Sequence, residues 1–214
     1  LTEGIHGLEF TFGDQVAYAH NYAFAFNGAS LDIGLAPLSK ETFVLAWISA
    51  NDNSTKFSIM STNGTTILAP VIVDNNVGEK SRVSVATINK THFVIAWINQ
   101  TNQDDLRVIY NINGTRLYGP SFGDGLVGTQ FYDIALAQIG DRLMYCYVDQ
   151  QENDADLMIY NNTGAVIGSE TTLDVNMNPD MNLANIYDCA NINSTRFVLF
   201  WYDAGTADDA IVSV

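Results

Sequence analysis

The sequence predicts an all-β protein with the fold of a four-bladed β-propeller. Three observations point to this fold: an apolar pentapeptide recurs about every fifty residues, short strand-like segments flank each copy, and Asn-Gly or Asn-Thr-Gly turns follow the first three copies. A repeat of this length is typical of blades with four strands each, whereas a β-sandwich does not normally repeat one pentapeptide at a constant interval. No stretch has a sustained helical period, so we expect almost no helix.

The pentapeptide defines the blades. Its copies read FVLAW at 43–47, FVIAW at 93–97, LMYCY at 143–147 and FVLFW at 197–201. Short segments rich in β-branched and aromatic residues, bounded by turn residues, are typical of strands. We therefore expect a single domain over 1–214, with blades at about 30–74, 75–124, 125–174 and 175–214.

The two ends of the chain predict how the ring closes. The fourth repeat stops after its expected third strand, and TFGD at 11–14 echoes SFGD at 121–124, which ends the second repeat. We expect residues 4–14 to form the fourth strand of the last blade, because such pairing removes an open sheet edge. The alternatives are a fragment of a larger propeller and repeats that close between chains.

An aromatic insertion occupies residues 15–29. Its bulky residues alternate with small ones, a period of two that is typical of a strand. One interpretation is an exposed strand that binds a partner, by stacking on sugar or by adding to the sheet of a neighbouring subunit. The alternative is that the segment packs over the channel as core. The candidate partner-binding residues are Tyr18, Tyr22, Phe24 and Phe26.

The FVxAW copies and the Asn-Gly turns resemble the blades of secreted bacterial and eukaryotic repeat proteins with Trp-containing propeller units of about fifty residues. The resemblance covers nearly the whole chain. It implies a fold rather than a chemistry, because the repeated apolar residues are core residues.

Composition and charge exclude several classes of protein. The chain has 9 basic and 24 acidic residues and a net charge of −15, so it would repel the phosphate backbone of a nucleic acid. No apolar run reaches the length of a transmembrane helix. The sequence begins at Leu1 without the features of a signal peptide, so we expect that a signal peptide has been removed or that the sequence begins inside a longer precursor.

Asn-x-Thr triplets predict N-glycosylation and therefore a secreted or cell-surface protein. With 21 Asn and 17 Thr in 214 residues, random placement predicts about two triplets, yet seven occur and no Asn-x-Ser is present. In a propeller, five of the asparagines would lie in loops on one face, and Asn53 and Asn99 on the opposite face. The predicted acceptors are Asn53, Asn63, Asn89, Asn99, Asn113, Asn161 and Asn193.

The cysteines and the clustered acids predict two further kinds of site. Cys146 and Cys189 fit an oxidising compartment and predict one disulfide; the alternative is that they are two buried thiols. Clustered acidic residues can supply oxygen ligands for calcium, and the best candidates are Asp149, Asp154 and Asp156. The alternative is that these residues are solvent-exposed acids at turns and strand edges. We expect no other cofactor, because no zinc-type spacing of His or Cys is present.

Catalysis has little support in the sequence. Asp32, Asp133 and Asp188 are the obvious carboxylates on the expected channel-facing strands, and no nucleophile motif or phosphate loop is found. We therefore expect a secreted, heavily N-glycosylated, non-enzymatic protein that is structural or adhesive and associates with copies of itself, as the repeating subunit of an extracellular filament or coat. The alternatives are a lectin-like carbohydrate-binding propeller and a glycoside-active enzyme.

Overall fold

The structure, a computed structural model, describes residues 11–12, 15–16, 30–76, 80–101, 104–122, 131–149, 154–174, 185–193, 196–202 and 210–213. Regular structure in these residues is entirely β, in five antiparallel sheets, which confirms the all-β prediction. No helix that is long and apolar enough to cross a membrane occurs in this part of the chain.

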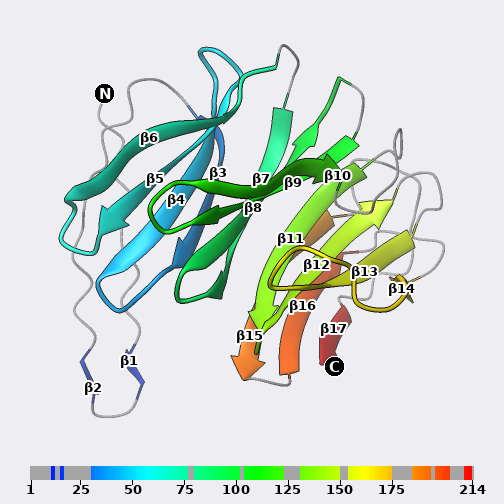
Figure 1. The fold of residues 1–214 in the computed structure, drawn as a ribbon. Helices are drawn as coiled ribbons and strands as arrows, with labels where there is room; N and C mark the ends of the chain where they lie inside the picture. The colour runs from blue at the N-terminus through cyan, green and yellow to red at the C-terminus, as the bar shows by residue number, and fades with distance from the viewer. Residues whose placement is uncertain are drawn as a thin grey trace.

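Four of the sheets are successive meanders that follow the sequence repeat (Figure 1). The first contains β3 (Ser30–Pro37), β4 (Thr42–Ser49), β5 (Thr55–Ser61) and β6 (Thr66–Asp74). The second contains β7 (Lys80–Asn89), β8 (His92–Asn99), β9 (Asp104–Asn111) and β10 (Arg116–Phe122). The third contains β11 (Phe131–Ile139), β12 (Arg142–Asp149), β13 (Asp154–Asn161) and β14 (Thr171–Asp174). The fourth contains β15 (Asn185–Asn193), β16 (Arg196–Tyr202) and β17 (Ala210–Ser213).

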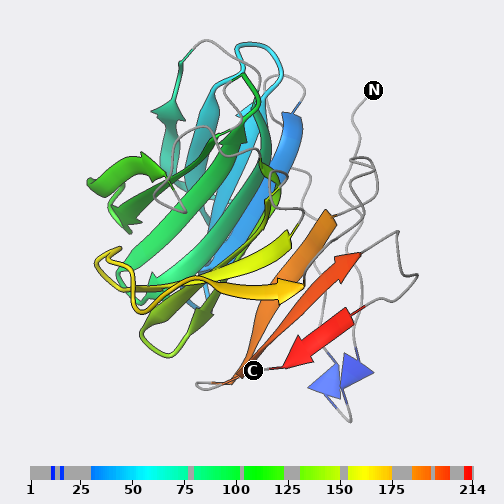
Figure 2. The ribbon, with the colours of Figure 1, turned by 90° about the vertical axis from the view of Figure 1, so that its right-hand side faces the viewer.

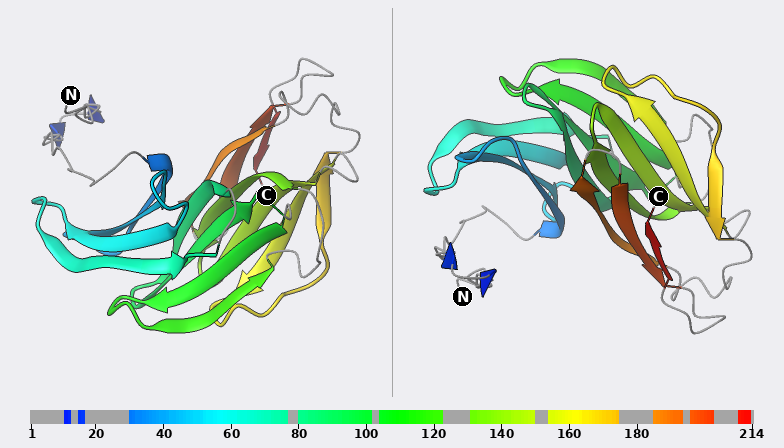
Figure 3. Two further views of the ribbon diagram at one scale, coloured as in Figure 1. Left: turned by 90° about the horizontal axis from the view of Figure 1, so that it is seen from above. Right: turned by 90° about the horizontal axis from the view of Figure 1, so that it is seen from below.

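The sheets are arranged like propeller blades around a common centre. Their first strands pack against one another in the order β3, β7, β11, β15, whereas the later strands of each sheet lie progressively further out (Figure 3). A view from the side shows the fourth sheet as a separate blade beyond the third (Figure 2). Every blade therefore presents its first strand to the centre of the molecule.

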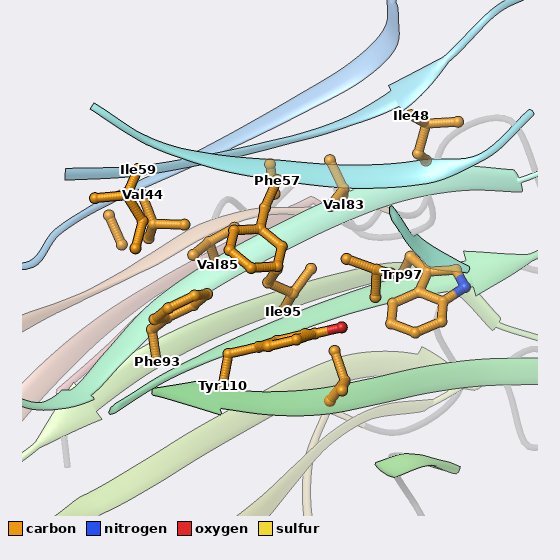
Figure 4. Packing of buried hydrophobic residues seen from close by; sticks show 14 residues of the cluster. Val44, Ile48, Phe57, Ile59, Val83, Val85, Phe93, Ile95, Trp97 and Tyr110 are labelled. Carbon is orange, nitrogen blue, oxygen red and sulfur yellow. The ribbon is translucent and has the colours of Figure 1, made fainter. Parts of the chain in front are cut away.

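The pentapeptide lies in the second strand of each blade, and β4 and β8 are apolar without alternation and buried along most of their length. In β8 the two faces of the strand pack in the clusters shared with the first and the third blade. Between the first two blades, the ring of Phe57 lies 5.2 Å from that of Phe93 and 4.6 Å from that of Tyr110, measured between centroids (Figure 4). The buried Trp97 belongs to the same cluster, so the repeated aromatic residue is part of the core.

Tight turns close the outer hairpins of the first three blades. Gly64, Gly114 and Gly164 have φ values of 88°, 80° and 87°, a conformation that residues with a Cβ rarely adopt. In each turn the glycine N–H donates to the carbonyl of the residue three positions earlier. The Asn-Gly and Asn-Thr-Gly motifs therefore form the turns expected from the sequence.

The described part of the predicted closing segment, Thr11–Phe12, does not pair with the last blade. Within segment 4–14, β1 (Thr11–Phe12) pairs with β2 (Gln15–Val16) in a two-stranded sheet of its own. This hairpin lies apart from β17 (Figure 1). The reason is that two residues separate β1 from β2, so a local hairpin forms without bringing the ends of the chain together. A four-bladed ring closed within one chain is not seen in the described ranges.

Candidate functional site

Charged residues occupy one repeated position on three consecutive inner strands. Asp32, Arg82 and Asp133 each directly precede the residue that pairs with the last aromatic residue of the pentapeptide. The three pairs are Ile33 with Trp47, Val83 with Trp97, and Ile134 with Tyr147. Since β3, β7 and β11 are neighbours, the repeat brings these charges together at one end of the central strands.

Hydrogen bonds hold the two carboxylates in place. Asp32 accepts from the N–H of Ile33 at 2.9 Å and, across the blade interface, from the N–H of Val83 at 2.7 Å. Asp133 accepts from the N–H of Ile134 at 3.0 Å. Asp32 therefore links the first blade to the second as well as contributing charge.

Arg82 lies beside Asp133 and is held in an unusual backbone conformation. Its φ is 49°, in the left-handed region that costs a residue with a side chain about 1–3 kcal/mol. The irregularity coincides with a shift in the β7–β8 register between Ser81 and Val83. The Nε atom of Arg82 is 3.4 Å from Oδ1 of Asp133, and the Arg82 side chain is half-exposed. Bulges of this kind re-aim a side chain next to a site.

The three charges border a central cavity of about 1050 Å³. Residues from all four inner strands line it, including Leu35 from β3 and Ala190 from β15. A cavity of this size is large enough to hold a small organic ligand. The charged cluster supplies polar groups at one end, whereas Leu35 and its neighbours supply apolar surface.

The acidity of Asp133 is strongly altered by its surroundings. Burial raises the pKa of Asp133 from 3.8 to about 7, although the nearby Arg82 guanidinium acts in the opposite direction. The negative charge of Asp32 adds to the rise. A carboxyl group that titrates near neutral pH inside a cavity marks a candidate functional site. The cluster can both donate and accept hydrogen bonds, which suits a ligand rich in hydroxyl groups.

The sequence anticipated part of this cluster. Asp32 and Asp133 were expected to face the channel, and both border the cavity, whereas the side chain of Asp188 lies outside the described part. Sequence reasoning missed Arg82. The fifty-residue interval between Asp32 and Arg82 is the signal that could have identified it.

A second buried polar cluster joins the second and third blades. The Tyr145 hydroxyl donates a hydrogen bond to the buried Asp105 carboxylate. The pKa of Tyr145 is well above its usual value because of burial and the adjacent Asp105. Arg107 donates to the carbonyl of Gly164 at 3.0 Å, and its guanidinium lies 3.8 Å from the centre of the Tyr160 ring. These groups lie within the blade interface and hold it together.

The seven sequon asparagines lie at the ends of strands and in turns, and none is buried. The meander order puts the turns that follow first and third strands on one face, and those that follow second strands on the other. Asn53 and Asn99 belong to the second group. The first group contains Asn63, Asn89, Asn113, Asn161 and Asn193.

Several sequons form the same local turn. The side-chain oxygens of Asn63, Asn89, Asn99 and Asn161 accept a hydrogen bond from the N–H two residues later, at 2.8–3.1 Å. In each case the donor is the sequon threonine, as in an Asx-turn. At Asn89 the side-chain nitrogen also lies 3.0 Å from Nδ1 of His92.

The structure has Cys146 and Cys189 as separate thiols rather than as the predicted disulfide. Both are buried in the apolar cluster between the third and fourth blades, together with Phe197 and Leu199. Buried cysteines behave as small apolar side chains, which accounts for their place in this cluster.

The proposed calcium ligands lie on one pair of strands. Asp154 pairs with Asp149 across β12 and β13, and Asp156 lies two residues further along β13. Asp156 is buried and Asp154 is half-buried. Among the side chains that the structure describes, no group of three or more metal-ligating residues has a suitable arrangement.

Asp52 is an exposed loop acid whose pKa lies well below its usual value because Lys56 and Ser54 hydrogen-bond to the carboxylate. Tyr18, Tyr22, Phe24 and Phe26 lie outside the described residues.

Comparison with known proteins supports the fold. No family model matches the chain, and no curated protein matches it. Among solved structures, the Hadza microbial sialidase Hz136 matches with a TM-score of 0.51 and 11% identity, over 81% of this chain and 34% of the sialidase. The chain thus spans about a third of the length of that propeller-like protein.

Two weaker matches add no argument. A prolyl endopeptidase matches with a TM-score of 0.38 and 11% identity, over 85% of this chain and 32% of that protein. A chain of a nidogen/laminin complex matches with a TM-score of 0.35 and 9% identity, over 86% of this chain and 80% of its own length. The match to the sialidase alone therefore supports a β-rich, propeller-like fold for this chain.

Proposed function

We propose that this protein is a secreted, N-glycosylated surface protein without enzymatic activity, with a structural or adhesive role and a tendency to associate with copies of itself. The observation that carries the proposal is the placement of all seven Asn-x-Thr sequons at strand ends and turns, where none of the asparagines is buried. Sequons placed in this way are accessible to the glycosylation machinery of a secretory pathway.

The test is expression of the chain behind a signal peptide in a eukaryotic secretory host. We expect enzymatic removal of N-glycans to lower the mass of the secreted protein and to convert the modified asparagines to aspartate, read by peptide mass spectrometry. Asn111, the last residue of β9, lies outside any sequon; it is the internal control and is expected to remain unmodified. A secreted protein with no loss of mass on this treatment would contradict the proposal.

A lectin-like activity is the second candidate, favoured by the central cavity. Asp32, Arg82 and Asp133 offer donors and acceptors for sugar hydroxyl groups at one end of this cavity. We expect Arg82→Ala to abolish binding on a glycan array, measured with calcium and with a chelator. Lys40→Ala, which changes an exposed lysine, is the matched control. An array without hits in either condition removes this candidate, and hydrolysis of a bound glycan would indicate the glycoside-active alternative.

A further inference from the structure

The carboxyl group of Asp133 is only partly satisfied at the central cavity. The residue is 6% exposed and lines the cavity. Its Oδ1 atom accepts from the N–H of Ile134 at 3.0 Å and lies 3.4 Å from Nε of Arg82. Its Oδ2 atom has no hydrogen-bond partner among the described residues and is not fully buried. Because a carboxylate oxygen taken out of bulk water is costly without a donor, a ligand that donates to Oδ2 is favoured.

The equivalent residue of the first blade shows which contact is missing. Asp32 precedes the residue that pairs with Trp47, as Asp133 precedes the residue that pairs with Tyr147. The Oδ2 atom of Asp32 accepts from the N–H of Val83 in the next blade at 2.7 Å. In the described part of the chain, the fourth blade supplies no such N–H to Asp133. The repeat therefore leaves one oxygen of Asp133 open toward the cavity.

The charges around this oxygen leave room for a cation. The charged groups that act on Asp133 are Arg82 from β7 and Asp32 from β3, whereas the side chain of Asp188 on β15 lies outside the described residues. With Asp133 ionised, these three described groups sum to −1. Lys90 also lines the cavity, but it lies eight residues beyond Arg82, or about 25 Å at the rise of a strand. At that distance salt screens its charge.

The acidity of Asp133 indicates the same lack of positive charge. Burial raises the pKa of Asp133 from 3.8 to about 7, and Arg82 only partly offsets this rise. The carboxyl group therefore holds a proton at a pH where an exposed aspartate is ionised. A ligand cation that reaches Oδ2 would replace this proton.

Apolar side chains lie exposed in the same cavity. Ile33 and Leu35 are 41% and 58% exposed and line the cavity, whereas the equivalent Val83 and Val85 of the second blade are buried. Apolar surface in a cavity gains free energy when an apolar part of a ligand covers it. The site therefore favours a ligand with a cationic end and an apolar body.

We propose that the central cavity binds a small organic amine, whose ammonium group donates to Oδ2 of Asp133 and whose apolar part lies against Ile33 and Leu35. Arg82 contacts Oδ1, so the two cations use different oxygens of the carboxylate. This ligand class differs from the sugars of the lectin-like candidate, because hydroxyl groups carry no charge that could replace the proton. The inference does not depend on glycosylation or on association between copies.

The first experiment titrates the chain with hexylamine in a calorimeter between pH 6 and pH 8. An alkyl ammonium group stays charged over this range, as lysine does. Because ionised Asp133 accepts the ligand, we expect the association constant to rise about tenfold from pH 6 to pH 8. At pH 6 we expect release of about one proton per ligand, read from the dependence of the heat on the buffer.

Hexanol and hexanoate are the neutral and anionic controls for this titration. Both are expected to bind more weakly than hexylamine at pH 8 and to gain no affinity as pH rises. Equal binding of hexanol and hexylamine would overturn the proposal, as would an affinity for hexylamine that does not change with pH.

The second experiment removes the carboxylate. Asp133→Asn is expected to weaken the binding of hexylamine at pH 8 at least tenfold and to abolish its pH dependence. Asp141→Asn is the matched control, because it changes the net charge equally and Asp141 lies exposed in the turn after β11, outside the described lining of the cavity. Equal binding by the two variants would show that the net charge of −15 attracts the amine, and would overturn the proposal.

Circular dichroism and thermal unfolding verify that both variants are folded. If Asp133→Asn does not fold, the release of protons by the wild type at pH 6 decides the outcome instead. Binding of hexylamine without proton release would then overturn the role of Asp133.

Discussion

The hydroxyl of Tyr145, in the third blade, donates a hydrogen bond to the buried carboxylate of Asp105, in the second. Both side chains are almost completely buried. Burial of a charged group is costly unless hydrogen bonds replace its hydration. The pair is therefore one of the contacts that fix how the two blades pack.

Tyr145→Phe is expected to lower the free energy of unfolding by about 1–3 kcal/mol, because Asp105 loses a donor while the ring and its packing remain. The measurement is chemical denaturation followed by tryptophan fluorescence. Tyr118→Phe removes a hydroxyl from an exposed tyrosine of β10, the strand that pairs with β9, where Asp105 lies. This substitution is expected to change stability little. Equal effects of the two substitutions would contradict this role of Tyr145.

The titration of Asp133 predicts how stability depends on pH. Its pKa in the folded protein is raised from 3.8 to about 7, so the folded state binds this proton more tightly than the unfolded state. The protonated Asp133 therefore adds to the free energy of unfolding. This stabilisation is fully present below pH 4 and is lost as pH rises to about 7, a change on the order of 4 kcal/mol at most. Asp133→Asn is expected to remove this slope in denaturation measured from pH 4 to 8.

Asp52→Asn is the control for that experiment. The pKa of Asp52 is lowered, so its contribution is present above pH 4 and is lost only as pH falls further. The substitution is therefore expected to leave the slope between pH 4 and 8 unchanged. An unchanged slope in Asp133→Asn would show that another group is responsible.

Gly114→Ala tests the fit between the turn of the second blade and the first blade. Gly114 has a φ of 80°, and a Cβ there would lie 2.6 Å from Cδ2 of Leu68. Gly168 has a φ of 87°, and no atom lies within 4 Å of the position that a Cβ on this residue would take. Both alanine variants carry the backbone strain of about 1–3 kcal/mol, so a greater loss of melting temperature in Gly114→Ala reports the contact with Leu68. Equal losses would show that Leu68 moves aside freely.

Lys80 is a buried cation at the junction of the first two blades. Its Nζ atom donates to the carbonyls of Asn53 and Asn76 at 2.7 Å and lies 3.6 Å from Oδ2 of the buried Asp74. Lys80→Met is expected to destabilise the fold by about 3–5 kcal/mol, because a buried carboxylate loses its cation. Chemical denaturation measures this loss.

Lys56→Met is the matched control for Lys80→Met. Lys56 pairs with Asp52, whose side chain is half-exposed, so breaking this pair is expected to change stability little. Similar losses for the two lysines would contradict the assignment of Lys80 to a buried ion pair.

The blades could be predicted from local patterns because their strands pair with neighbours along the chain. The copies of FVLAW form second strands, and the Asn-Gly motifs form the outer turns. Part of the sequon pattern also follows from this repetition, since Asn63 and Asn113 occupy the same turn in two blades. The Asx-turns explain why asparagine and threonine suit these places even without sugar.

The candidate site could be predicted only in part. Asp32 and Asp133 were identified because carboxylates are rare on the inner strands, whereas Arg82 had no local pattern to mark it. Its role depends on Asp133, which is fifty-one residues away and in another sheet. The two cysteines illustrate the same limit, because the types of residue permit either a disulfide or two buried thiols, and the structure has two separate buried thiols.

By itself, the sequence determined the all-β class, the repeat and its turns, because these depend on residues a few positions apart. Only the tertiary structure decided which charges meet at the central cavity and which carboxylates are buried. These depend on how one sheet packs against the next. The inner strands carry similar apolar residues, yet Leu35 is exposed at the central cavity whereas the equivalent Val85 is buried between the first two blades.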